Sequence, residues 1–188
     1  MKIRKRNGAV EEYRREKIER VIRLAYESVR VSHVNASQLA ADIEGALLSR
    51  GEEIITVESI QDQVEAALMV AGQYEAAKSF ILYRNERSRA RSAREQILVH
   101  FVRRDALDAT LKELQREFAG EEYALPQLTA RFRSLHKGSQ SDDSGLSSLI
   151  KAAAELTTRD APDWEMIAAR FWLLRFHSQL KQHEAAAG

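Results

Sequence analysis

Residues 3–13 read Ile-Arg-Lys-Arg-Asn-Gly-Ala-Val-Glu-Glu-Tyr. The pair Asn7-Gly8 divides this stretch into two short runs, and Asn-Gly suits the positive φ angles of a two-residue hairpin turn. The sequence therefore predicts a β-hairpin that opens the chain, with Lys5 and Arg6 on its first strand.

The predicted hairpin is basic, whereas the segment that follows is acidic. Residues 1–30 hold ten Lys and Arg against five Glu, and residues 35–75 hold eight Asp and Glu against one Arg. The net charge of +1 for the whole chain hides this asymmetry, although a binding partner meets the local charge. Because helix N-termini also attract anions, a basic hairpin followed directly by a helix predicts a site for phosphate.

The remainder of the chain is predicted to be mainly helical. Only 2 prolines and 8 glycines occur in 188 residues, which leaves room for uninterrupted helices. Apolar residues spaced by three and four positions predict the first helix over residues 16–29. In the first half we also expect a helix over 36–49, a third strand over 53–56, a helix that Thr56 caps and that stops at Gly72, and a helix from 73 into the arginine-rich segment 84–94.

A change of composition near residues 95–105 predicts a domain boundary. We therefore expect one domain over residues 1–93 and a second, all-helical segment over residues 94–188. In the second segment we expect helices near 107–118, 126–135, 146–158 and 164–180, with an exposed loop over 136–145 that is rich in Gly, Ser, Gln and Asp.

The composition excludes several classes of function. The chain has no cysteine, so disulfides, thiolate zinc sites and thiyl-radical chemistry within it are excluded, and the five histidines show no metal-ligand spacing. It has no Gly-rich phosphate loop ending in Gly-Lys-Ser/Thr. No apolar run approaches the roughly 18 residues that cross a bilayer, and no signal peptide is present, so we expect a cytoplasmic protein without a membrane partner.

Four segments, 3–8, 15–18, 55–65 and 74–84, resemble the ATP-cone family in sequence and in order. The resemblance implies a helical bundle capped by a small three-stranded sheet, with a pocket for ATP or dATP between them. ATP-cones occur chiefly at the N-terminus of ribonucleotide reductase large (catalytic) subunits, as the allosteric region in which ATP activates and dATP inhibits. They also occur in a zinc-ribbon repressor, whose ribbon the missing cysteines exclude from this chain.

The second half resembles the same family in two ways, and we leave both open. Residues 149–171 look like the helical segment that leads into the reductase large subunit, and also like the closing helices of a cone. Residues 96–182 are then a reductase helical region or a degenerate second cone without the basic hairpin. We expect either a shortened reductase or a separately encoded regulatory piece. In both cases it should not reduce ribonucleotides alone, because the catalytic barrel and its cysteines are missing, so its place as an enzyme is left uncertain. The partners implied are that barrel, a radical-generating subunit, and other copies in a homo- or hetero-oligomer.

The resemblance also implies a nucleotide site. Lys5, Arg6 and Lys17 match phosphate ligands, and Glu11 matches an acidic residue near the base and the sugar. Mg²⁺ would accompany the triphosphate as a counterion. The complete set of implied site residues is Lys5, Arg6, Glu11, Arg14, Lys17, Val57, Gln61, Tyr83, Arg84 and Arg87.

A nucleic-acid-binding module and a purely structural helical adaptor are the alternatives. The basic N-terminus and the arginines of residues 84–94 would suit a phosphate backbone. The acidic middle of the chain and the lack of aromatic residues among the basic ones count against nucleic acid.

Overall fold

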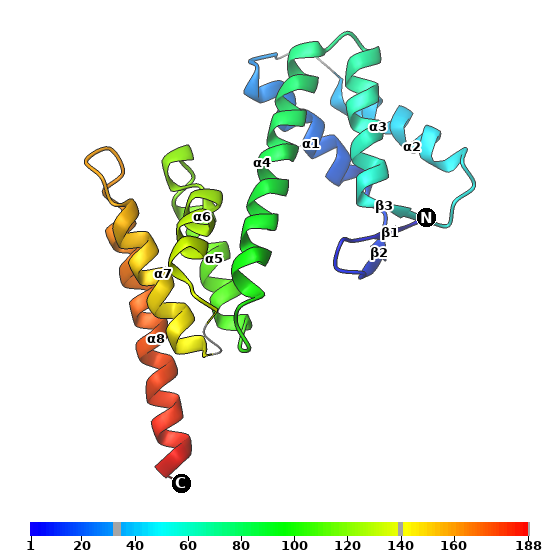
Figure 1. The fold of residues 1–188 in the computed structure, drawn as a ribbon. Coiled ribbons are helices and arrows are strands. Elements are labelled where there is room, and N and C mark those ends of the chain that lie inside the picture. Colours follow the sequence, from blue (N-terminus) through cyan, green and yellow to red (C-terminus); the bar gives the residue numbers. More distant parts are fainter. Residues whose placement is uncertain (32–34, 139–140, 188) are drawn as a thin grey trace. The chain divides into compact units, whose positions relative to one another are not determined.

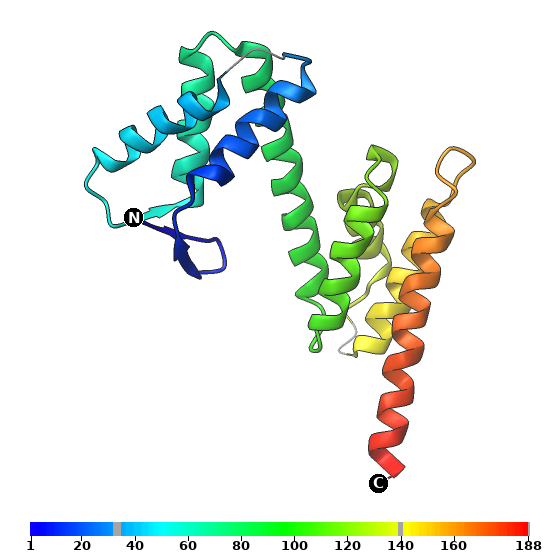
Figure 2. The same ribbon diagram turned by 180° about the vertical axis from the view of Figure 1, so that it is seen from behind.

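The computed structural model describes residues 1–31, 35–138 and 141–187 (Figure 1, and from behind in Figure 2). The chain divides into an N-terminal unit, Met1–Asn85, and a C-terminal unit, Glu86–Gly188. The boundary falls within helix α4 (Tyr74–Leu98), which contributes residues to both units. Eight helices, α1 to α8, and one small sheet make up the described residues, which confirms the mainly helical fold class.

The sheet confirms the predicted hairpin and third strand. Strand β1 (Lys2–Arg4) pairs antiparallel with β2 (Val10–Glu12) and parallel with β3 (Ile54–Thr56), so the strand order is β2-β1-β3. Ile3 and Ile55 are neighbours in this register, are 7% and 1% exposed, and belong to the core that the helices form. The sheet therefore covers the helices of the N-terminal unit with one face.

The hairpin turn is longer than predicted. The N–H of Lys5 donates to the carbonyl of Ala9 at 2.8 Å, and the N–H of Gly8 donates to the carbonyl of Lys5 at 2.9 Å. Gly8 has a φ of +83°, whereas Asn7 is not among the described residues with positive φ. This is a three-residue loop with glycine in the left-handed position, and not a two-residue turn. As a result Lys5 ends the pairing and Arg6 lies in the turn, so the placement of both on the first strand was wrong.

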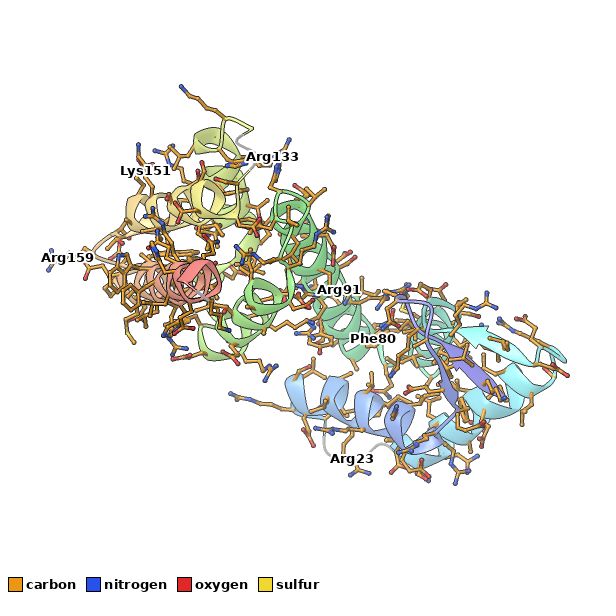
Figure 3. All side chains as sticks on the ribbon, turned by 90° about the horizontal axis from the view of Figure 1, so that it is seen from below. Arg23, Phe80, Arg91, Arg133, Lys151 and Arg159 are labelled. Atoms are coloured by element: carbon orange, nitrogen blue, oxygen red, sulfur yellow. The ribbon has the colours of Figure 1, made fainter. Side chains whose placement is uncertain are left out.

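The N-terminal unit holds helices α1 (Arg15–Ser28), α2 (Ala36–Leu48), α3 (Val57–Val70) and the first part of α4. The predicted apolar stripe of α1 is buried, with Ile22 fully covered. The hydroxyl of Thr56 accepts from the N–H of Ser59 at 3.1 Å, which confirms the predicted cap of α3. From α4, Phe80 (labelled in Figure 3) completes this core at 4% exposure.

The C-terminal unit holds the rest of α4, helix α5 (Asp105–Glu117), a short 3₁₀ turn (Glu121–Tyr123), and helices α6 (Leu125–Leu135), α7 (Asp142–Leu156) and α8 (Trp164–Ala187). Its core is separate and centres on buried aromatic and aliphatic side chains, among them Phe132, Trp164 and Phe171. Charged side chains such as Lys151 and Arg159 point away from the unit (Figure 3). None of its described residues forms a strand.

Helix α7 begins inside the segment that was predicted to be a loop. Ser141 caps it, because its hydroxyl accepts from the N–H of Ser144 at 3.2 Å, and α7 starts at Asp142. The loop prediction over 136–145 was therefore wrong for residues 142–145, and residues 139–140 lie outside the described part of the chain. Within the described ranges, no helix combines the length and apolar character required to span a membrane.

Candidate functional site

Three of the implied site residues meet where the hairpin faces helix α1. Glu11 lies opposite Ile3 in the register, so both point to the helix-covered face of the sheet, and Lys5 follows Ile3 by two positions on that same side. Lys17 extends from the first turn of α1. The Glu11 carboxylate contacts both lysines, with 2.7 Å from Oε2 to Lys5 Nζ and 2.8 Å from Oε1 to Lys17 Nζ.

This contact alters the acidity of the carboxyl group. Hydrogen bonds from Lys17 and then from Lys5 lower the pKa of Glu11 to about 2, from an ordinary value of 4.5. Glu11 is therefore ionised at neutral pH. All three side chains keep between 31% and 54% of their surface exposed, so solvent and solutes reach the cluster.

Arg6 links the hairpin turn to helix α3. Its Nη2 donates to the side-chain carbonyl of Gln61 at 2.9 Å, and its Nε forms an ion pair with Glu58. Glu58 and Gln61 are three residues apart on α3, so they lie on one face of the helix. A guanidinium group has five N–H donors, and these two contacts leave three of them for another acceptor.

The start of α1 adds further donors. Asn35 and Thr56 cap α2 and α3 with their side chains, whereas Arg14, at the corresponding position of α1, makes no side-chain cap. No side-chain oxygen caps the first N–H groups of this helix, although the N–H of Lys17 donates to the carbonyl of Arg14 at 3.2 Å. Arg14 therefore contributes to the site through its position at this helix end, and its side chain is exposed.

The residues from α3 and α4 divide into two groups. Val57 begins α3 and packs against the N-terminal core, close in sequence to Glu58 and Gln61. Arg84 of α4 instead pairs with two acidic residues of α3, with 2.6 Å from Nη1 to Asp62 Oδ1 and 3.5 Å to Glu65 Oε2.

Tyr83 is 57% exposed, and Arg87 is exposed in the part of α4 that belongs to the C-terminal unit. In the described ranges, the hydrogen bonds and ion pairs of Tyr83, Arg84 and Arg87 thus do not connect them to the hairpin. Among the described residues, the hydrogen bonds and ion pairs join Lys5, Glu11 and Lys17 in one group, Arg6 and Gln61 in another, and Arg84 with α3 in a third.

Sequence reasoning missed Glu58. Its signal was present, because Glu58 precedes Gln61 by three residues and α3 was predicted to be helical there, which places the two on one face. Its ion pair with Arg6 depends on the turn geometry, however, and the turn was predicted to be shorter.

Two surface depressions lie elsewhere in the N-terminal unit. Their volumes are about 460 and 430 Å³, and both lie along α1 with Glu19, Arg23 and Glu27 in their linings. The implied site residues line neither of them. In the described part of the chain, no group of three or more His, Cys, Asp or Glu side chains is placed to hold a metal ion.

Comparisons with known proteins give the family that the N-terminal segments resemble. A family model described as an ATP cone domain matches residues 1–89. The chain is 42% identical over 183 residues to the ribonucleoside-diphosphate reductase subunit alpha of Treponema pallidum (strain Nichols), a match that covers 94% of this chain and 22% of the relative. It is 33% identical over 146 residues to the subunit of the same name from Chlamydia pneumoniae, covering 68% of this chain and 14% of the relative. The chain thus spans 22% or less of the length of these relatives.

Proposed function

The chain belongs to the ATP-cone family through residues 1–89, and from that premise we propose that it is the adenine-nucleotide-sensing region of a ribonucleotide reductase. ATP or dATP would act as its allosteric effector. The observation that carries the proposal is the convergence of Lys5 and Lys17, from the hairpin and from α1, on one anionic group. Two ammonium groups held this close provide a position for a phosphate group.

Further donors suit the remaining phosphates. A nucleoside triphosphate carries about four negative charges, so one pair of lysines does not neutralise it. Arg6 has three N–H donors left, and the start of α1, which no side chain caps, favours anions. Mg²⁺ would arrive with the triphosphate, which itself would supply most of the oxygen ligands.

We assign the adenine side of the site to the start of α3. Val57 offers an apolar contact, and the amide of Gln61 offers N–H donors to the base, while its oxygen accepts from Arg6. Glu11, Arg14, Tyr83, Arg84 and Arg87 remain part of the proposed site through the family pattern. In this proposal residues 1–93 act as the nucleotide-binding domain, and residues 94–188 as the helical segment that accompanies it.

Regulation requires that the nucleotide distinguish two states of the protein. ATP and dATP differ only at the ribose 2′ position, and a ligand shifts an equilibrium only by its differential affinity for the states. We propose that the bound nucleotide changes how the cone packs against its partners, which are the catalytic barrel, the radical-generating subunit or other copies of the chain. The output would be a change of quaternary structure in the cytoplasm.

Calorimetry with ATP, dATP and a short DNA duplex tests the proposal. We expect heat from the two nucleotides. Duplex binding with a steep salt dependence and no nucleotide heat would favour a nucleic-acid module instead, and heat from none of the three would favour a structural adaptor. Light scattering with and without dATP tests the proposed change of assembly.

Removing the lysine pair tests the site. Lys5→Ala combined with Lys17→Ala is expected to keep the helical circular dichroism signal and to lose dATP binding, because the two cations nearest to the proposed phosphate are removed. Lys137→Ala combined with Lys151→Ala is the matched control, since both lysines are exposed residues of the C-terminal unit. Unchanged dATP affinity in the first variant would reject the site.

A further inference from the structure

The Glu11 carboxylate occupies the position that the proposed function gives to a phosphate. Each of its oxygens accepts from one lysine, at 2.7 Å from Lys5 Nζ and 2.8 Å from Lys17 Nζ. A carboxylate and a phosphate group offer the same kind of acceptor to ammonium donors, namely negatively charged oxygens that share one central atom. The lysines are therefore already engaged by an anion that belongs to the chain itself.

We propose that Glu11 is an internal competitor of the nucleotide, and that binding requires its carboxylate to leave the position between Lys5 and Lys17. The inference rests on the proposed function, because it concerns the same site. It replaces the role near the base and sugar that the family pattern implied for Glu11 with an autoinhibitory contact.

Simultaneous occupation is unfavourable. An ammonium group has three donors, so each lysine has donors to spare, but a phosphate held by both lysines would lie next to the ionised Glu11. Like charges a few ångströms apart repel each other, more strongly at a protein surface than in bulk water. Protonation of Glu11 does not relieve this repulsion near neutral pH, because even its ordinary pKa of 4.5 lies well below 7.

Displacement of Glu11 is nevertheless accessible. Glu11 lies on β2, which is an edge strand bonded only to β1, and its side chain is 31% exposed. Exposed ion pairs contribute little each, so their loss is a modest cost that the additional charges of a triphosphate outweigh. The contact would lower nucleotide affinity without abolishing it, and would so raise the concentration at which the sensor responds.

The neighbouring residue supplies a matched control. Glu12 lies on the same strand, opposite Lys2, and successive residues of a strand point to opposite faces. Glu11→Gln and Glu12→Gln therefore remove the same charge from adjacent positions, but only the first removes the ion pairs with Lys5 and Lys17.

The experiment is calorimetric titration of the full chain and of both variants with ATP and with dATP at one fixed salt concentration. We expect Glu11→Gln to bind about three- to tenfold more tightly than Glu12→Gln, as the loss of two weak exposed pairs implies. Equal affinities would overturn the competitor role. Weaker binding by Glu11→Gln would overturn it too, and would support a contact with base or sugar.

Two further outcomes separate this inference from the proposed function. Heat from Glu11→Gln with none from the unaltered chain would support the competitor in its strongest form. No heat from any of the three proteins, with their circular dichroism unchanged, would overturn the proposed function and the competitor with it. A structure of the chain with ATP provides a second measurement, in which we expect both Glu11 oxygens to lie beyond ion-pair distance from Lys5 and Lys17.

Discussion

The ion pairs that α8 makes in the C-terminal unit are arranged differently from those of the hairpin in the N-terminal unit. In the C-terminal unit, two arginines of α8 each contact both oxygens of a carboxylate on another helix. Arg175 contacts Asp143 of α7 through Nε and Nη2 at 2.7 and 2.8 Å, and Arg170 contacts Glu117 of α5 through Nη2 at 3.0 and 2.9 Å. In the N-terminal unit, Glu11 is shared by two lysines, and the turn residue Arg6 is shared by two residues of α3.

The difference separates charges that support packing from charges available to a ligand. Arg175 and Arg170 join α8 to its neighbouring helices beside a large apolar core, and each is paired with a carboxylate of the same unit. The hairpin cations lie outside the N-terminal core, which is built from other side chains. A ligand that took over Lys5 or Arg6 would leave that core in place.

The largest effect should come from the core of the C-terminal unit. Trp164 is 1% exposed, and its indole N–H donates to the carbonyl of Glu122 at 2.9 Å. Trp164→Ala should lower the free energy of unfolding of this unit by about 3–5 kcal/mol, measured by urea denaturation followed by circular dichroism. If the two units have the separate roles proposed here, ATP binding by calorimetry should survive.

Trp172→Ala is the control for this change, because Trp172 is 52% exposed and its loss should cost less than about 1 kcal/mol. Loss of nucleotide binding in Trp164→Ala, with Trp172→Ala unaffected, would mean that the units do not act separately.

Replacing a helical glycine by alanine should change the free energy of unfolding in opposite directions in the two units. A Cβ on Gly145 of α7 would come within 2.6 Å of the Phe101 ring, which is buried, whereas a Cβ on Gly45 of α2 would meet nothing within 4 Å. We expect Gly145→Ala to destabilise the protein by about 1–3 kcal/mol through overpacking. Gly45→Ala should stabilise it by about 0.5–1 kcal/mol, because alanine is the better helix former.

Thermal unfolding of the two single variants and of the double variant checks this pair. The sites lie in different units, so the two changes should add. A stabilising Gly145→Ala would show that the Phe101 ring moves aside without cost, and would contradict the expected overpacking.

The smallest effect concerns pH. Burial, and then the nearby His100, lower the pKa of His136 from its ordinary value of 6.5, so the unfolded chain binds the proton more readily than the folded one. The C-terminal unit should therefore be fully stable above pH 6.5 and should lose stability as the pH falls through the lowered pKa. Glu11 also makes the folded chain lose stability as the pH falls, but only between pH 4.5 and about 2.

Urea unfolding of the whole chain at pH 7 and pH 5 measures this difference. His136→Phe should reduce the loss of stability between these two values, and His183→Phe, at an exposed position, should leave it unchanged. If His136→Phe loses as much stability between pH 7 and pH 5 as the unaltered chain, another group causes the acid sensitivity.

Local signals accounted for most of the fold. The Asn7-Gly8 pair predicted the hairpin, and Thr56 predicted the start of α3, because turn and cap preferences act over a few residues. The start of α7 was missed because Ser141 to Gly145 have the composition of a loop. In the structure Asp142 accepts from the N–H groups of Val102 and Arg103, at 2.7 and 3.0 Å, and such a contact with residues forty positions away has no local signature.

The candidate site was predictable in part. The basic hairpin before a helix start predicted a phosphate site, and the family pattern then named its residues, among them Lys5, Arg6, Glu11, Lys17 and Gln61. Glu58, and the bridging of two lysines by Glu11, did not follow from either source. Both depend on the length of one turn and on the side of the sheet that each residue faces.

The sequence by itself determined where the strands and most of the helices form and which part of the chain is basic, since turn chemistry, capping and apolar periodicity are properties of neighbouring residues. Only the tertiary structure decided which anion each of these cations meets. Ion pairing depends on distances between side chains from separate elements, and the three-residue turn together with the register of Ile3 opposite Glu11 sets those distances.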